Sequence, residues 1–188
     1  VRLVKHYKDG GRDVTEITGL NFSAHDLKNG SAGKIELAAT IAMDKAAQPS
    51  APPGSFRAKV GGSFAFDLLA DLQPASIKGS TTFTVEQAAG AVAELTTLAA
   101  RLDCEVTPTE LKQVALRFTK AAAALGEVRV SGPLNLAKQE GKLKAEILAL
   151  DRQVLNLAAA GSGMDFGTTT INSSTDIELT KGGQEISL

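Results

Sequence analysis

The chain has 188 residues and a formal net charge of −1, from 20 Lys and Arg residues against 21 Asp and Glu residues. Its length fits one domain with a sizeable core, and the balanced charge argues against nucleic acid as a partner. The aromatic content is only 4%, with no Trp, so little in the chain suits stacking on bases or sugars.

The cysteine content and the start of the chain limit other classes of protein. Cys104 is the only cysteine, which excludes an internal disulfide and a metal site of several thiolates. We interpret it as a half-buried hydrophobic residue. The chain opens on Val1 within a strand-like run, and neither a signal peptide nor a membrane-spanning apolar segment is recognisable. We therefore interpret residues 1–188 as one β-rich domain from a longer protein, in which any membrane anchor lies outside this segment.

Alternating apolar residues predict antiparallel strands through the first half of the chain. Residues 34–41 are the clearest case, because Ile35, Leu37, Ala39 and Ile41 share one face. A Pro- and Ala-rich connection at residues 45–54 follows. The predicted strands are Arg2–Lys8 and Asp13–Thr18, joined by Asp9-Gly10-Gly11, then Leu20–Ala24, Lys34–Ile41, Phe56–Val60, Ser63–Leu72 and Ser80–Val85.

Two stretches predict helices. In residues 88–102, apolar residues recur at steps of three and four, which is typical of one helical stripe. Asp151 is a candidate N-cap for a second helix that extends to about residue 160 and that Gly161-Ser162-Gly163 ends. Thr107-Pro108-Thr109-Glu110 is compatible with a third helix start. However, Val114, Leu116 and Phe118 alternate with other residues, which favours a turn and a strand.

The stretch Leu125–Leu150 predicts a hairpin with one apolar face. Lys138-Gln139-Glu140-Gly141 is its expected turn, and Phe166–Leu179 then predicts a strand pair or one long bent strand. With these elements, the order strand, helix, strand occurs at Ile77–Thr119 and again at Lys142–Thr180, which indicates an internal duplication. The predicted fold class is α+β and β-rich, with a curved, mostly antiparallel sheet and two short helices packed on one face.

No arrangement of reactive residues predicts catalysis. Asp165-Phe166-Gly167 matches the magnesium-binding tripeptide of protein kinases, but its companion motifs are absent from the sequence, so we interpret it as a turn. Gly161-Ser162-Gly163 lacks the spacing of a phosphate-binding loop or a nucleophile elbow. His6 and His25 lie on different predicted strands without a partner for a triad or a zinc site. We expect no enzymatic activity, no metal and no cofactor.

Three stretches carry a family resemblance: Gly19–Ile41, Ala124–Leu157 and Asp165–Gly183. With their repeated amphipathic strands, they resemble the AsmA family of Gram-negative envelope proteins, which is related in style to TamB, YhdP and the bridge-like lipid transfer proteins. The resemblance implies a periplasmic β-sheet whose apolar trough guides phospholipid, with an inner-membrane anchor elsewhere in the full-length protein. It also implies that adjacent segments of the same protein, or other envelope proteins, are partners.

The apolar face needs a cover, because a large exposed apolar patch is costly. Two short helices cover only part of a long sheet, so we expect acyl chains to lie on the rest. The candidate lipid-facing residues are Phe64, Phe66, Leu68, Leu116, Phe118, Val128 and Val130. Two alternatives remain open at this point: these residues form an ordinary core under the protein's own helices, or the chain is a structural domain whose sheet edges pair with neighbours.

Overall fold

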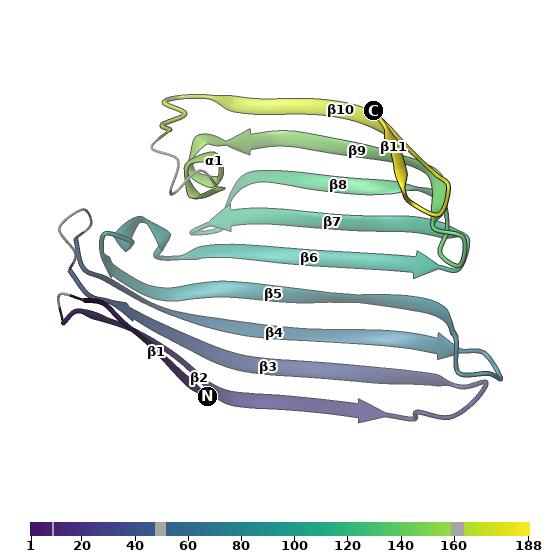
Figure 1. Cartoon of the computed structure of the whole chain (residues 1–188), viewed down its shortest axis with the longest axis horizontal. Helices are drawn as coiled ribbons and strands as arrows, with labels where there is room; N and C mark the ends of the chain where they lie inside the picture. Colours follow the sequence, from purple (N-terminus) through teal and green to yellow (C-terminus); the bar gives the residue numbers. More distant parts are fainter. Residues whose placement is uncertain (9, 48–51, 159–163) are drawn as a thin grey trace.

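The described residues form a single antiparallel sheet of eleven strands in sequence order (Figure 1). A computed structural model describes residues 1–8, 10–47, 52–158 and 164–188. Strands that are consecutive in the sequence are neighbours in the sheet, so the sheet is an antiparallel meander. Such a meander needs only local connections, and Gly, Asn or Asp residues lie in several of them, for example Asn29-Gly30 and Gly182-Gly183.

The strands of the central part of the sheet are long, and those at its two edges are short. Their bounds are β1 (Arg2–His6), β2 (Arg12–His25), β3 (Ala32–Lys45), β4 (Gly54–Leu68), β5 (Pro74–Gly90), β6 (Leu98–Thr107), β7 (Glu110–Lys120), β8 (Ala123–Asn135), β9 (Glu140–Asp151), β10 (Thr170–Thr180) and β11 (Glu185–Ser187). Helical residues form a 3-10 turn, η1 (Ala93–Leu95), and a short helix, α1 (Arg152–Ala158).

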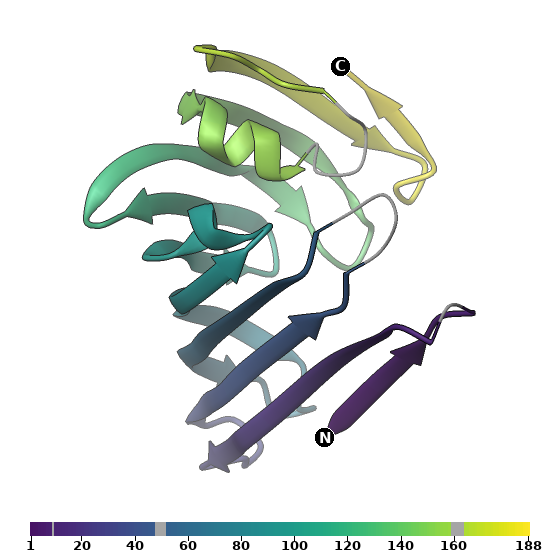
Figure 2. The same cartoon turned by 90° about the vertical axis from the view of Figure 1, so that its left-hand side faces the viewer.

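The sheet is curved into a trough. Seen along the strands, it forms an open arc, with α1 on the concave side (Figure 2). Register shifts interrupt several pairs, for example between Thr18 and Asn21 in the β2–β3 pair and between Arg57 and Ala58 in the β4–β5 pair. Such bulges add local twist and bend to a sheet, so they contribute to the curvature.

The cross-strand register separates the side chains into an apolar and a polar face. One row across the sheet joins Ile35, Phe64, Gly79, Cys104, Val114, Val130 and Ala145. The adjacent row on the opposite face joins Glu36, Ser63, Ser80, Asp103, Ala115, Arg129 and Glu146. Because α1 packs on the apolar side, the apolar face is the concave one.

The helix α1 and its neighbours cover one end of the concave face. There, Leu125, Leu150, Val154 and Leu155 form the buried cluster, with Phe118 and Val128 packed against it. The whole chain exposes 11571 Å², compared with about 8,500 Å² for a compact protein of this mass. Much of the apolar face therefore remains accessible.

The predicted α+β fold class is wrong, since 71% of the chain is strand in one open sheet. The helix predicted at residues 88–102 is replaced by the end of β5, the turn η1 and the first half of β6. Gly90 and Thr97 have positive φ values of 64° and 65°, which a helix interior does not accommodate. In addition, Arg101 and Asp103 alternate with apolar neighbours, and this alternation suits pairing with β5 and β7.

The predicted duplication is also wrong, because its first half contains no helix. In the described part of the second predicted helix, Arg152–Ala158 are helical, and the proposed stop at residues 161–163 lies outside the described residues. Asp151 Oδ1 accepts a hydrogen bond of 2.8 Å from the backbone N–H of Gln153 at the start of α1. In the described part of the chain, the predicted two-helix cover is therefore reduced to the short helix α1 and the 3-10 turn η1.

Several strand predictions are confirmed, usually with longer bounds. The hairpin at Leu125–Leu150 corresponds to β8 and β9, and the first hairpin corresponds to β1 and the start of β2. The separate strand at Leu20–Ala24 is a continuation of β2, and the two strands around Gly61-Gly62 are one strand, β4. Thr107–Glu110 forms a turn before β7, as the alternation of Val114, Leu116 and Phe118 indicates.

A candidate apolar groove on the concave face

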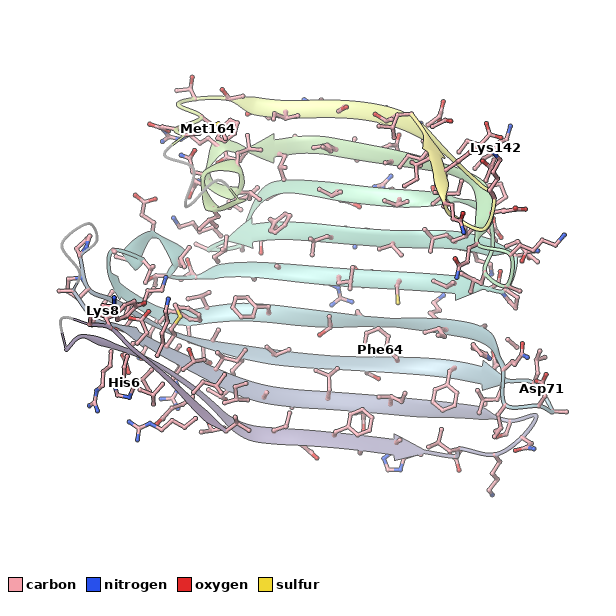
Figure 3. All side chains as sticks on the ribbon, in the orientation of Figure 1. His6, Lys8, Phe64, Asp71, Lys142 and Met164 are labelled. Carbon is pink, nitrogen blue, oxygen red and sulfur yellow. The ribbon has the colours of Figure 1, made fainter. Side chains whose placement is uncertain are left out.

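An apolar groove lies on the concave face where β3, β4 and β5 meet the loops at one end of the trough. Its volume is about 280 Å³, and every side chain that lines it is apolar. The lining residues are Leu27, Ile35, Phe64, Phe66, Leu68, Pro74 and Ile77. Phe64 lies on β4 in the view onto this face (Figure 3). The groove has no side-chain hydrogen-bonding group, so it suits an aliphatic occupant.

Two glycines allow the phenylalanine rings to lie close to the sheet. Phe66 is opposite Gly33 on β3, and Phe64 is opposite Gly79 on β5. A Cβ atom at Gly33 would lie 2.4 Å from the Phe66 ring, and one at Gly79 would lie 2.7 Å from the Phe64 ring. The rings therefore occupy the space that a side chain on the neighbouring strand would fill, as in aromatic cover of strand glycines. This arrangement gives the groove its floor.

The seven predicted lipid-facing residues lie on the same face but not in one pocket. Phe64, Phe66 and Leu68 line the groove. Leu116 pairs with Val128, and Val130 shares a cross-strand row with Phe64. Phe118 and Val128 pack against the cluster under α1. These two residues therefore belong to the protein's own core, which was the alternative to lipid contact. Leu116 and Val130 are half-buried in the middle of the face.

The end of the trough opposite to the groove is filled by the protein itself. Leu95 of η1, Leu98 of β6 and Leu157 of α1 line a remnant space of only about 20 Å³. Lys120 Nζ donates a hydrogen bond of 2.8 Å to Gln153 Oε1, which connects β7 to α1. The trough consequently has one closed end and one open end.

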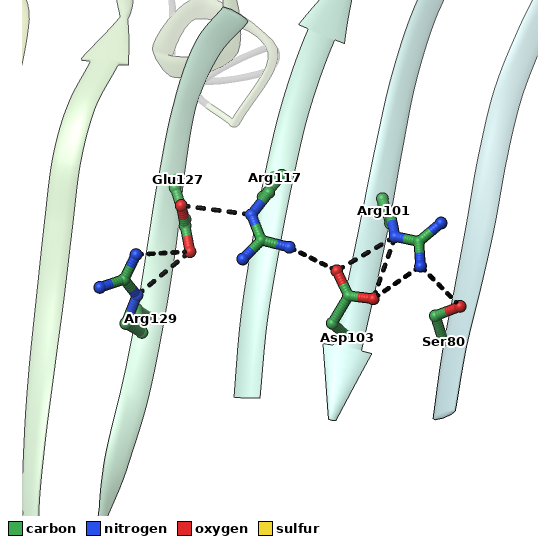
Figure 4. A network of polar contacts seen from close by, with 6 residues as sticks. All are labelled: Ser80, Arg101, Asp103, Arg117, Glu127 and Arg129. Atoms are coloured by element: carbon green, nitrogen blue, oxygen red, sulfur yellow. Dashed lines mark hydrogen bonds and ion pairs between the residues drawn. The ribbon is translucent and has the colours of Figure 1, made fainter. Parts of the chain in front are cut away.

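The convex face carries a ladder of charges over β6, β7 and β8 (Figure 4). Arg101 and Arg117 both bind Asp103, and Arg117 and Arg129 both bind Glu127, at distances of 2.5 to 3.3 Å. The Arg101 guanidinium, which donates hydrogen bonds to Asp103, holds the pKa of that carboxyl below its ordinary value. The ladder crosses three strands and stabilises their pairing.

A larger hollow of about 600 Å³ lies beside this ladder. Its charged lining residues are Lys78, Arg101, Asp103, Glu105 and Arg117, and each already has an ion-pair partner within the protein. A ligand would have to displace these internal pairs. The hollow is thus a weaker candidate than the apolar groove.

The other residues that the sequence singled out do not form a reactive centre. His6 lies on β1 and His25 at the end of β2. Asp165 accepts hydrogen bonds from the Gly167 N–H at 2.9 Å and from Asn156 Nδ2 at 3.1 Å, so the Asp-Phe-Gly tripeptide is a turn beside α1. Burial raises the pKa of the Cys104 thiol above its ordinary value, which disfavours a nucleophilic role. Among the described residues, no three His, Cys, Asp or Glu side chains gather to hold a metal ion.

Sequence reasoning missed four groove residues: Leu27, Ile35, Pro74 and Ile77. The alternation in residues 34–41 already placed Ile35 on an apolar face, and this signal was sufficient to include it. Ile77 lies opposite Phe66, a pairing that depends on the register between strands. Leu27 lies in a loop and Pro74 begins β5 next to one, where side-chain periodicity carries no information.

Comparisons of the chain with protein-family models, curated proteins and solved structures find no match. In the described part of the chain, no helix has the length and apolar character needed to cross a membrane.

Proposed function

We propose that this chain is a non-catalytic, AsmA-like envelope domain whose concave face binds or guides the acyl chains of phospholipid or another lipid. The observation that carries the proposal is the groove of about 280 Å³ lined only by apolar side chains. Acyl chains offer no hydrogen bonds and gain free energy by leaving water. An apolar groove that continues into a half-buried apolar face is complementary to such a ligand.

The cellular setting is part of the same proposal. By its resemblance to the AsmA family, the domain is periplasmic and belongs to a protein anchored in the inner membrane through another segment. Neighbouring segments or other envelope proteins would then continue the trough. The paired charges of the convex face support this arrangement, because they suit contact with water while lipid occupies the concave side.

A second candidate function is a structural domain that associates through its sheet edge. The free part of β2 favours it, since β1 pairs only with residues 12–16 of β2. Beyond them, Leu20 and Phe22 are 69% and 66% exposed. Exposed strand edges of this kind accept an additional strand.

Lipid uptake by the purified chain tests the first candidate. We expect co-purified lipid in native mass spectrometry and saturable binding of a fluorescent fatty acid. Ile77→Glu places a carboxylate in the groove and should weaken the binding by about tenfold or more, because a charge is costly in an apolar site. Thr82→Glu is the matched control on the same strand, since Thr82 is opposite Arg101 on the polar face. Absence of lipid and of fatty-acid uptake in the wild type would overturn the proposal.

Cys104 provides an independent readout, because it lies on the concave row that contains Phe64. A bound acyl chain should slow the reaction of its thiol with a maleimide at pH 8. Equal labelling rates with and without fatty acid would contradict binding along this row. If lipid does not bind while the chain associates with rising concentration, the structural function is favoured instead.

A further inference from the structure

Two loops meet at the open end of the trough. Residues 26–31 connect β2 to β3, and residues 69–73 connect β4 to β5. The Gly30 N–H donates to the Leu69 carbonyl at 3.0 Å, and Asn29 Nδ2 donates to the Ala70 carbonyl at 3.0 Å. Asp71 marks the second loop at this end in Figure 3. These contacts join the loops into one tip, which we call the leucine tip.

The leucine tip exposes large aliphatic side chains where turns normally carry polar ones. Leu27 is 62% exposed, Leu69 is 46% exposed and Leu72 is 54% exposed. Leu72 also has a φ of 66°, a left-handed conformation that favours Gly or Asn and costs free energy for leucine. The exposed Leu72 side chain contributes little to packing within the chain, so it is available for a contact outside the chain.

The leucine tip is continuous with the groove. Leu27 belongs to both, and Leu68 and Pro74, which line the groove, flank the loop at residues 69–73. The opposite end of the trough is filled by α1 and η1. An acyl chain that moves along the trough therefore has its accessible entrance among these leucines.

The composition of the leucine tip indicates what it contacts. The two loops contain no Trp, Tyr or Arg, the residues that most often anchor protein interfaces. Their charged residues are Asp26, Lys28 and Asp71, which gives no excess positive charge for anionic headgroups. Three leucines at the mouth of an apolar groove match the hydrocarbon just below the surface of a bilayer.

We infer that the leucine tip inserts into the surface of a lipid bilayer and places the mouth of the groove against the acyl chains. This inference rests on the proposed function, since the contact would deliver acyl chains to the groove. Vesicle binding and fatty-acid uptake are nevertheless measured separately. Because burial of aliphatic surface drives the insertion, neutral phosphatidylcholine vesicles should bind as well as vesicles that contain phosphatidylglycerol. High salt should have little effect on the binding.

Vesicle flotation of the purified chain with phosphatidylcholine vesicles tests the inference. The variant Leu69→Ser/Leu72→Asn leaves the groove lining intact, and Asn tolerates the left-handed backbone at position 72. We expect it to lose about tenfold or more in vesicle partitioning, and to keep wild-type uptake of fluorescent fatty acid from solution. The control Leu3→Ser/Val4→Ser removes comparably exposed residues from β1, which are 59% and 40% exposed, and should partition like the wild type.

Three results would overturn the inference. They are a wild type that does not float with phosphatidylcholine vesicles, a tip variant that floats as well as the wild type, and flotation that requires phosphatidylglycerol and disappears in high salt. If the wild type takes up fatty acid from solution without binding vesicles, the proposed function stands and the bilayer contact is wrong. If it binds vesicles through the tip without taking up fatty acid, the inference stands and the groove is not the acyl site.

Discussion

At the residue scale, the glycines beneath the groove determine how closely its aromatic floor lies on the sheet. A Cβ atom at Gly79 would lie 2.3 Å from the Ser63 carbonyl oxygen and 2.6 Å from the Phe64 Cα, both of which are backbone atoms. Since a backbone cannot yield as a side chain can, we expect Gly79→Ala to destabilise the protein by about 2 kcal/mol. The measurement is the free energy of unfolding in urea.

Gly61 is the matched control for Gly79, because a Cβ atom there meets nothing within 4 Å. Gly61 lies on β4 and does not have a positive φ angle, so alanine fits its backbone conformation. Gly61→Ala should therefore be neutral, or stabilising by up to about 1 kcal/mol through the unfolded state. Equal destabilisation by the two substitutions would show that glycine packing under the phenylalanine rings does not matter.

The charge ladder predicts a loss of stability in acid. Arg101 and Arg117 keep the pKa of Asp103 below its ordinary value of 3.8. A carboxyl with a lowered pKa in the folded state stabilises the protein fully above its unfolded pKa, and this contribution disappears as pH falls from about 3.8 towards the folded pKa. Asp103→Asn should reduce stability at pH 7 by about 1 kcal/mol and make the melting temperature less dependent on pH below 4. Calorimetry of both proteins between pH 7 and pH 3 measures this, and parallel melting curves across that range would contradict it.

At the element scale, the strands and the short helix α1 were predictable, and the absence of a helix at residues 88–102 was not. Residues 34–41, 128–131 and 142–147 alternate, and an alternating face favours a strand. Residues 88–102 carry small and apolar residues at spacings that are compatible both with the 3.6-residue period of a helix and with the two-residue period of a strand. There, hydrogen bonding of Leu98–Thr107 to strands on both sides outweighed the helical pattern. Whether such a segment forms a helix or a strand depends on its pairing with distant strands, which cannot be read from the local sequence pattern.

The short helix α1 owes its stability to packing, because seven residues form few helical hydrogen bonds. Leu155 is only 8% exposed and belongs to the buried cluster, whereas Leu157 is 38% exposed. Leu155→Ala should cost about 3 kcal/mol, through lost burial and the cavity left behind. Leu157→Ala should cost less than about 1 kcal/mol. The measurement is the free energy of unfolding of both variants in urea. Similar losses of stability would mean that α1 is not held by the packing of Leu155.

At the scale of the whole molecule, the sheet is an open surface with one apolar and one polar face. The sequence was sufficient to predict a curved apolar face and to place Phe64, Phe66 and Leu68 on it. The groove itself depends on Ile77 opposite Phe66 and on loops that fold over the end of the trough. These relations between distant segments follow from strand register and loop contacts, and they have no signature within a single stretch of sequence.

An open sheet also has two edges, and they are protected differently. The free edge of β10 carries Asp176 and a register shift between Ile171 and Ser173, both of which hinder pairing with another chain. The free part of β2, residues 19–24, has no charged residue. Both free edges contain a register shift, which on β2 lies between Thr18 and Asn21, so the difference between them is the charge. Because an edge without charged side chains accepts a further strand more readily, we expect the purified chain to associate through β2.

Leu20→Lys tests this expectation by placing a charge on the β2 edge. Sedimentation velocity between about 10 and 200 μM should show concentration-dependent association of the wild type, and a predominantly monomeric variant. Ser174→Lys on the β10 edge is the matched control and should associate like the wild type, because that edge is already protected. A monomeric wild type, or association that Leu20→Lys leaves unchanged, would mean that the curvature of the sheet alone prevents edge pairing. In that case, the concave face would be left as the principal apolar contact surface of the molecule.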